Sequence, residues 1–201
     1  MLFVGHDLTG GRLGRVPLAA AELHDLRERT TSFAGIGGIW SNTTMITGEN
    51  PEELRIGLVT TDFFEVLGAS AAYGRTFTAA DEGAAPAMVL SHALWQRRFG
   101  GDPSVVGSTI RVSDGQRIIV GVMPPGFRTM MPPDSNIPDD LQAWLPLESS
   151  WFGEAPRGQR FLRVVARMRP DVTFAQAEGE IARVGTDIGR EHVFYGERGC
   201  A

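Results

Sequence analysis

The sequence contains no lysine and only one cysteine, Cys200, so all 19 of its basic residues are arginine. A single cysteine excludes an internal disulfide and a metal site built from cysteines. Long apolar runs are also missing. The longest is residues 33–40, in which three of the eight residues are glycine, whereas a membrane-spanning helix needs about 20 apolar residues. The N-terminus has neither a basic segment nor a long apolar core, so a secretion signal is not expected.

The 201 residues suffice for one large domain or two small ones. The formal net charge is −5, which argues against a nucleic-acid partner. Hydrophobic residues make up 42% of the chain and charged residues 21%, as in an ordinary globular protein. The 25 glycines and 12 prolines indicate many turns and short elements rather than a helical bundle.

The apolar pattern mixes helices and strands without a regular alternation, which predicts an α+β fold. A helix is expected over 18–29, with Leu23 and Leu26 on one face. The other face is expected to lie in solvent and carries Glu22, Asp25, Glu28 and Arg29. A short helix is expected to begin at an acidic cap, Asp62, and to end at Gly68. The remaining elements expected are strands over 39–47, 53–60 and 87–90, a helix over 91–99, a hairpin around 114–115, a strand over 161–168 and a helix over 173–190.

The hairpin prediction depends on which side chains share a face. If the two strands alternate without interruption, a three-residue loop, 113–115, places Ile110 and Val112 on the same face as Ile118, Val120 and Val122. A two-residue loop would mix apolar and polar faces. We therefore expect the three-residue loop, with its last glycine in a left-handed conformation.

The C-terminal helix carries the clearest local signals. Thr173 and Gln176 have the spacing of a capping box, in which each side chain bonds the backbone of the other. Apolar residues then recur every three or four positions, as on one buried face of a helix. These residues are Phe174, Ala177, Ile181, Val184 and Ile188.

Motifs that carry chemistry are few. No two of the four histidines (His6, His24, His92 and His192) have the spacing of metal ligands. Ser91 and His92 are adjacent, and a small hydrolase using this pair is one hypothesis, although no orienting acid or nucleophile elbow accompanies them. The glycine-rich segments at 10–15 and 35–38 lack the remaining residues of a phosphate loop or of a dinucleotide-binding turn.

Two arginine-containing segments allow two interpretations each. Arg97 and Arg98 beside Trp95 and Phe99 would either stack on a ligand or cover two core aromatic residues. The outer face of the strand over 161–168 would be either an anion-binding strip or an ion-paired surface; its arginines are Arg163, Arg167 and Arg169. The structural interpretation is favoured in both cases. No catalytic, cofactor-binding or metal-binding residue is therefore expected.

Several strings, in order and spacing, resemble the MacB-like periplasmic core domain of bacterial ABC transporter permeases, of the FtsX/MacB and acidobacterial types. The resemblance extends over about residues 17–195. The strings are LRER at 26–29, SF at 32–33, FFEVLG at 63–68, GRTF at 74–77, VLSHALWQRRFGGDP at 89–103, VG at 106–107, GVMPPGF at 121–127, WLP at 144–146 and FLRVVAR at 161–167.

The resemblance implies a non-catalytic domain on the periplasmic side of the inner membrane, with a porter-like α/β part and an inserted β-rich part. Residues 17–70 and 160–192 would form the porter-like part, and residues 71–150 the insertion. Residues 1–16 would be an N-terminal strand and loop, and 193–201 a tail. Its partners would be the membrane-helix part of the same permease, a cytoplasmic ABC ATPase subunit and a second permease copy. No cofactor is implied. The domain would couple ATP-driven movement of membrane helices to the handling of a substrate or partner.

In the family, membrane helices flank this domain, and none is found before Met1 or after Ala201. The chain is therefore expected to be a truncated piece, with a strand or an apolar helix face left uncovered. The alternative function is a stand-alone extracytoplasmic module that binds a peptide or small molecule through Trp95, Trp144 and Trp151.

Overall fold

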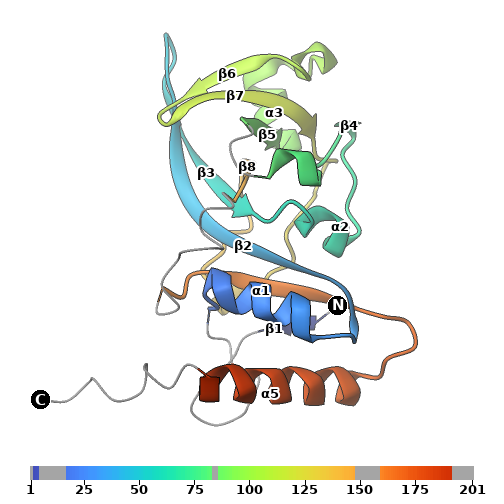
Figure 1. Ribbon diagram of the computed structural model, residues 1–201. Helices are drawn as coiled ribbons and strands as arrows, with labels where there is room; N and C mark the ends of the chain where they lie inside the picture. The colour runs from blue at the N-terminus through green and yellow to red at the C-terminus, as the bar shows by residue number, and fades with distance from the viewer. Residues whose placement is uncertain (1, 5–16, 83–85, 148–158, 192–201) are drawn as a thin grey trace, which may run out of the picture. The chain divides into compact units, whose positions relative to one another are not determined.

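The computed structural model describes residues 2–4, 17–82, 86–147 and 159–191 (Figure 1). The chain forms two compact units. Unit 1 comprises Met1–Gly38 and Ser150–Ala201, and unit 2 comprises Ile39–Ser149. Unit 2 begins at Ile39 because the strands around residues 40–60 pair with the rest of that unit.

Unit 1 combines a three-stranded sheet with two helices. Its strand order is β1 (Leu2–Val4), β9 (Arg163–Met168) and the first part of β2 (Phe33–Ile46), and β1 runs antiparallel to β9. Helices α1 (Ala20–Arg29) and α5 (Phe174–Glu191) pack against each other, as Figure 1 shows. Among the described residues, β1 is the terminal strand of the strand order.

Helix α5 follows the sequence pattern closely. The backbone N–H of Thr173 donates to Oε1 of Gln176 at 2.8 Å, and the N–H of Gln176 donates to Oγ1 of Thr173 at 3.3 Å, which confirms the capping box. The buried stripe begins one turn later than predicted, because Phe174 is 55% exposed. The other four residues of the stripe are buried, so this apolar helix face is covered.

The solvent-exposed polar face predicted for α1 is wrong at Glu22 and Asp25, whereas Glu28 is exposed. Glu22 and Asp25 are each only 6% exposed. Glu22 accepts the backbone N–H of Ala19 at 2.9 Å through Oε2, and Nη2 of Arg160 at 2.7 Å through Oε1. Buried carboxylates need such partners. The partner of Glu22 comes from a segment 138 residues away, where helical periodicity gives no signal.

Unit 2 is a small closed barrel of six strands. The second part of β2 pairs with β3 (Glu52–Val59), which pairs in turn with β8 (Ala143–Pro146) and then β5 (Ala87–Leu90). Strand β5 pairs with β7 (Gly115–Val122), and β7 pairs with β6 (Thr109–Val112). Strand β6 returns to β2, where Val112 faces Ile46. Closure leaves none of these six strands without a neighbour on either side.

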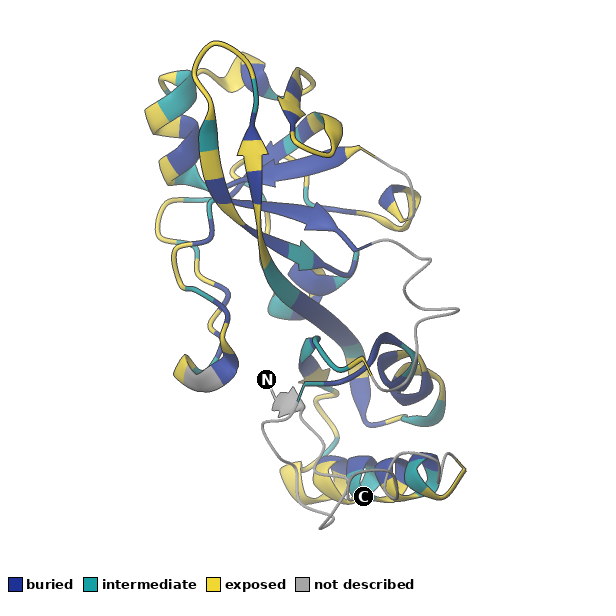
Figure 2. Ribbon diagram, turned by 90° about the vertical axis from the view of Figure 1, so that its left-hand side faces the viewer, coloured by how far each residue is buried: buried dark blue, intermediate teal, exposed yellow. Residues whose placement is uncertain are grey.

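The remaining elements of unit 2 surround the barrel. Strand β4 (Tyr73–Gly74) pairs antiparallel with the last two residues of β7, Gly121 and Val122. Helix α2 is Phe63–Leu67, helix α3 is His92–Phe99, and the short 3-10 turns are η1 (Ala79–Asp81), η2 (Pro103–Val105) and η3 (Pro133–Ser135). Figure 2 shows the strands of the barrel mostly buried, whereas exposed residues are concentrated in the surrounding loops and on the outer faces of the helices. The core consists of Ile46, Leu54, Ile56, Met88, Leu90, Leu94, Trp95, Val105, Ile110, Val112, Ile119, Val122, Ala143 and Leu145.

The β6–β7 hairpin has a two-residue loop, so the three-residue prediction is wrong. Val112 pairs with Gly115, and Ile110 pairs with Arg117. The interior face of β7 carries Ile119 and Val122, while Ile118 is 40% exposed. Gly115 has the predicted positive φ, +131°.

The physical reason is a β-bulge in β7. Along β5, Met88 pairs with Ile119, but the next residue, Val89, pairs with Gly121, so Val120 is an extra residue. The extra residue reverses the side-chain alternation, and residues three apart therefore share one face. Unbroken alternation was the assumption behind the prediction.

The ends of the two helices in unit 2 are capped in different ways. Ser91 caps α3, and Gly68 ends α2 with a left-handed φ of 68°, as predicted for a helix that stops at this glycine. Asp62 does not cap α2 through its side chain. Its Oδ1 instead accepts the hydroxyl of Thr60 at 2.6 Å, a bond made two residues back along the chain.

Candidate functional site

Ser91 and His92 both have structural roles. Oγ of Ser91 accepts the backbone N–H of Leu94 at 3.2 Å, which satisfies one of the free donors at the start of α3. The ring of His92 lies edge-on to Trp95, with 5.2 Å between ring centroids. A nucleophile and its base would instead donate and accept directly between the two side chains. Ser91 and His92 therefore form the N-terminal end of α3 and do not have the geometry of a nucleophile and its base.

Replacing Ser91 with alanine is expected to lower the free energy of unfolding by about 1 kcal/mol, because the cap is lost. Urea unfolding followed by circular dichroism measures this change. Hydrolysis of a nitrophenyl ester should be indistinguishable from the buffer rate in the original protein, in Ser91→Ala and in His92→Ala. Hydrolysis by the original protein that disappears in both variants would contradict the structural role.

The side chains of Trp95 and Trp144 are not available for stacking on a ligand. Trp95 is 3% exposed, and its Nε1 donates to the carbonyl oxygen of Asp102 at 2.9 Å. Trp144 is 2% exposed and packs edge-on against Phe64 and Phe127, with centroid distances of 5.7 and 5.4 Å. Trp151 lies outside the described residues. The binding-module hypothesis loses two of its three aromatic residues.

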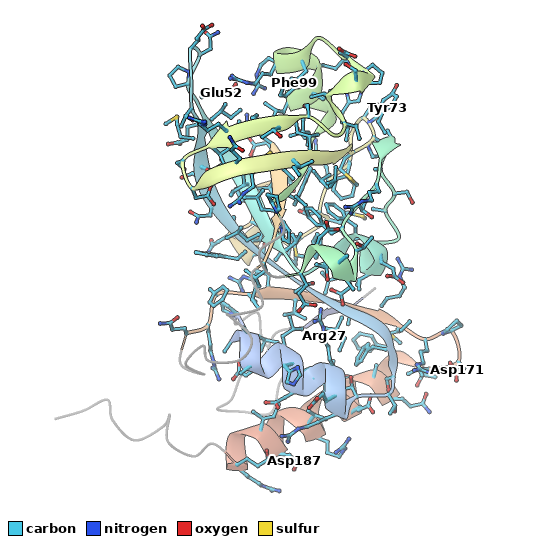
Figure 3. The ribbon with its side chains drawn as sticks, turned by 45° about the horizontal axis from the view of Figure 1, so that its top comes forward. Arg27, Glu52, Tyr73, Phe99, Asp171 and Asp187 are labelled. Atoms are coloured by element: carbon cyan, nitrogen blue, oxygen red, sulfur yellow. The ribbon has the colours of Figure 1, made fainter. Side chains whose placement is uncertain are left out.

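The arginines singled out in the sequence are engaged within the fold. Arg97 and Arg98 both pair with Glu52, the first residue of β3, which is labelled in Figure 3. Nε of Arg169 donates to the carbonyl oxygen of Phe33 at 3.3 Å. Arg163 and Arg167 also have interaction partners. These contacts favour the structural interpretation of both arginine segments.

Other sequence candidates contribute no site to the described residues. His24 lies 3.3 Å from Glu28 on the exposed face of α1. His6, His192, Cys200 and the 10–15 segment lie outside the described part of the chain. Within the described part, no three metal-ligating side chains come together. No helix there is both long enough and apolar enough to span a bilayer.

Unit 1 contains a polar cluster that the sequence did not reveal, which we call the β2 anchor: Arg27, Thr31, Ser32, Arg169 and Glu180. Glu180, on α5, accepts the backbone N–H groups of Thr31 and Ser32, each at 2.9 Å, and the Thr31 hydroxyl at 3.0 Å. Burial opposes the charge of this carboxylate, but the hydrogen bonds from Ser32 and Thr31 outweigh burial and lower the pKa of Glu180 below its usual value.

The carbonyl groups at the start of β2 are held as well. The backbone N–H of Arg169 donates to the oxygen of Ser32 at 3.0 Å. Arg27, labelled in Figure 3, donates through Nε and Nη2 to the oxygen of Ile36 at 3.0 and 2.8 Å. The anchor thus satisfies two backbone donors just before β2 and backbone acceptors from Ser32 to Ile36. Its partners lie up to 149 residues apart, so single-sequence patterns carry no signal for it.

The polar residues described above cap helices, anchor strands and pair across the elements of an α+β fold. The sequence matches the model of the MacB-like periplasmic core domain over residues 2–184. The chain therefore belongs to the MacB-like periplasmic core domain family. It is a non-catalytic periplasmic domain of an ABC transporter permease of the MacB/FtsX-like type.

Solved structures share the fold. The periplasmic region of MacB from Actinobacillus actinomycetemcomitans is 15% identical, with a TM-score of 0.63 over 99% of this chain and 92% of that one. The extracellular domain of the ABC-type transporter YknZ from Gram-positive bacteria is also 15% identical, with a TM-score of 0.60 over 94% of this chain and 92% of that one. No curated protein sequence matches this chain.

Proposed function

We propose that this domain couples ATP-driven movement of the permease's membrane helices to the handling of a substrate or partner in the periplasm. ATP is hydrolysed by a cytoplasmic ABC ATPase subunit, and two permease copies work as a dimer. Residues 17–70 and 160–192 serve as the porter-like part, and residues 71–150 as the inserted β-rich part. The domain itself carries out no reaction and acts through changes in position.

One observation carries this proposal: β2 is a single strand of 14 residues that begins in unit 1 and continues into the barrel of unit 2. An extended strand is already close to its maximal length per residue, so it transmits tension without stretching. In unit 2 it is held by eight residue pairs with β3. The alternative, a stand-alone binding module, has no comparable support, because Trp95 and Trp144 are buried.

A spin label tests the proposal in the assembled transporter. With Cys200 replaced by serine, Arg183→Cys places a label on α5 at a side chain that is 61% exposed. In a dimer, the two labels should give a defined distance that changes when a non-hydrolysable ATP analogue binds. An ATPase variant that binds no nucleotide is the control. The same distance with and without nucleotide would contradict the coupling role.

A further inference from the structure

The contacts between α5 and the rest of unit 1 are of two kinds. The buried stripe of α5 is apolar: Ala177, Ile181, Val184 and Ile188. Apolar burial is non-directional, so such a face fixes the position of a helix along its axis less sharply than directional bonds do. Hydrogen bonds to a carboxylate depend on distance and angle, so they fix the position of the helix along its axis. At the start of β2, Glu180 makes three such bonds at 2.9, 2.9 and 3.0 Å.

The residues that Glu180 holds are the junction between α1 and β2. Thr31 and Ser32 follow the C-cap of α1, Thr30, and immediately precede the first residue of β2, Phe33. The carbonyl oxygens of Ser32 and Phe33 are held by Arg169. A displacement of α5 therefore acts on the start of β2 through the Glu180 carboxylate. Strand β2 is extended and cannot lengthen, and it continues into the β2–β3 ladder of unit 2.

We infer that Glu180 is the positioning residue through which movement of α5 reaches β2 and, along it, the barrel of unit 2. This inference rests on the proposed coupling function and names the contact that it uses. A second ion pair, between Arg29 and Glu191 at 2.8 Å, joins α5 to the end of α1 but not to β2. It holds the two helices together without acting directly on the strand.

The first test measures the contact in the isolated 201-residue chain. In Glu180→Ala, the amides of Thr31 and Ser32 should exchange with deuterium at least about tenfold faster, because their charged acceptor is gone. Glu180→Gln keeps one acceptor oxygen and should exchange at an intermediate rate. The matched control is Glu178→Ala, the same change at an exposed position of the same helix. Unchanged exchange in Glu180→Ala, or equal acceleration in Glu178→Ala, would overturn the inference.

The second test measures transmission in the assembled transporter. Labels are placed at residue 183 on α5 or at residue 49, an exposed position beyond the end of β2 in unit 2. In the original protein, nucleotide should shift the distance between copies at both positions. In Glu180→Ala, the shift at 183 should persist and the shift at 49 should be lost, and Glu180→Gln should restore part of it. Glu178→Ala should leave both shifts unchanged.

The outcomes separate the two ideas. If no nucleotide-dependent shift occurs at residue 183 in the original protein, the proposed function fails. If residue 183 shifts and residue 49 still shifts fully in Glu180→Ala, the coupling function stands and the role of Glu180 is overturned.

Discussion

Replacing Gly121 with alanine is expected to destabilise the barrel by about 3 kcal/mol or more, because the added methyl group has no space. A Cβ at this position would lie 2.1 Å from the carbonyl oxygen of Arg75, and 3.0 Å from that residue's backbone carbon and nitrogen. These are backbone atoms, so a side-chain rotation cannot relieve the contact. A loss of this size corresponds to a fall in melting temperature of about 10 °C for a chain of this length.

The close approach occurs where β4 and β7 pair, because a glycine of one strand lies opposite a glycine of the other. Gly74 of β4 lies opposite Gly121 of β7, and a Cβ at Gly74 would be 2.3 Å from the carbonyl oxygen of Val120. Gly74 also has a φ of +69°, a conformation that favours glycine. Because neither residue has a side chain, β4 can pair closely with the bulged end of β7.

The matched control is Gly179→Ala on α5. No atom lies within 4 Å of a Cβ at this position. In the middle of a helix, the exchange of glycine for alanine should stabilise the protein by about 1 kcal/mol. Thermal unfolding should therefore move in opposite directions for the two glycine variants. A melting temperature for Gly121→Ala within a degree or two of the original protein would show that the strands separate without cost.

The second large effect is expected at Asp81, where Asp81→Asn should cost about 2–3 kcal/mol of stability. The Asp81 side chain is buried, and its two carboxylate oxygens accept Nη1 and Nη2 of Arg75 at 2.5 and 3.0 Å. One of these oxygens also accepts the backbone N–H and the hydroxyl of Thr78 at 2.8 and 3.0 Å. The expected loss of stability is smaller than for a fully buried ion pair, because the Arg75 side chain is 48% exposed and water screens its charge.

An exposed ion pair in the same unit provides the control. Arg128 and Asp139 are separated by 3.3 Å, with both side chains more than 60% exposed. Asp139→Asn should change stability by less than about 0.5 kcal/mol, because solvent screens such a pair. Urea unfolding at neutral pH compares the two variants. Equal losses in Asp81→Asn and Asp139→Asn would contradict the buried clamp.

The Asp81 clamp also predicts a dependence on pH. The hydrogen bond from Arg75, followed by those from Thr78, holds the pKa of the Asp81 carboxyl below its ordinary value. A group whose pKa is lower in the folded state contributes its full stability above the ordinary aspartate pKa of about 3.9 and loses it as the pH falls through the lowered value. The difference in unfolding free energy between the original protein and Asp81→Asn should therefore be constant at neutral pH and shrink below about pH 4.

The two wrong sequence predictions in unit 2 share a cause. The hairpin prediction at Gly115 depends on strict alternation, and one extra residue at Val120 reverses that alternation. Asp62 has the residue type of an acidic helix cap, but its carboxylate accepts the hydroxyl of Thr60. In each case a local pattern allowed two arrangements, and pairing with a neighbouring strand or side chain selected the one that the pattern did not favour.

Signals that act within a few residues were already decided by the sequence. These include the capping box of α5, the serine cap of α3, the glycine end of α2 and the mixture of helices and strands, because each depends on neighbours within one helical turn or one strand. The family itself could also be recognised from the sequence, because the family model matches residues 2–184.

The tertiary structure alone decided the closure of the barrel through β6 and β2, the burial of Glu22 and the pairing of Glu180 with the start of β2. The partners in these contacts are 66 to 149 residues apart, as between Ile46 and Val112 or between Thr31 and Glu180. Which distant residues meet depends on the order and register of the strands, and these are set by the packing of the whole sheet rather than by any short stretch of sequence.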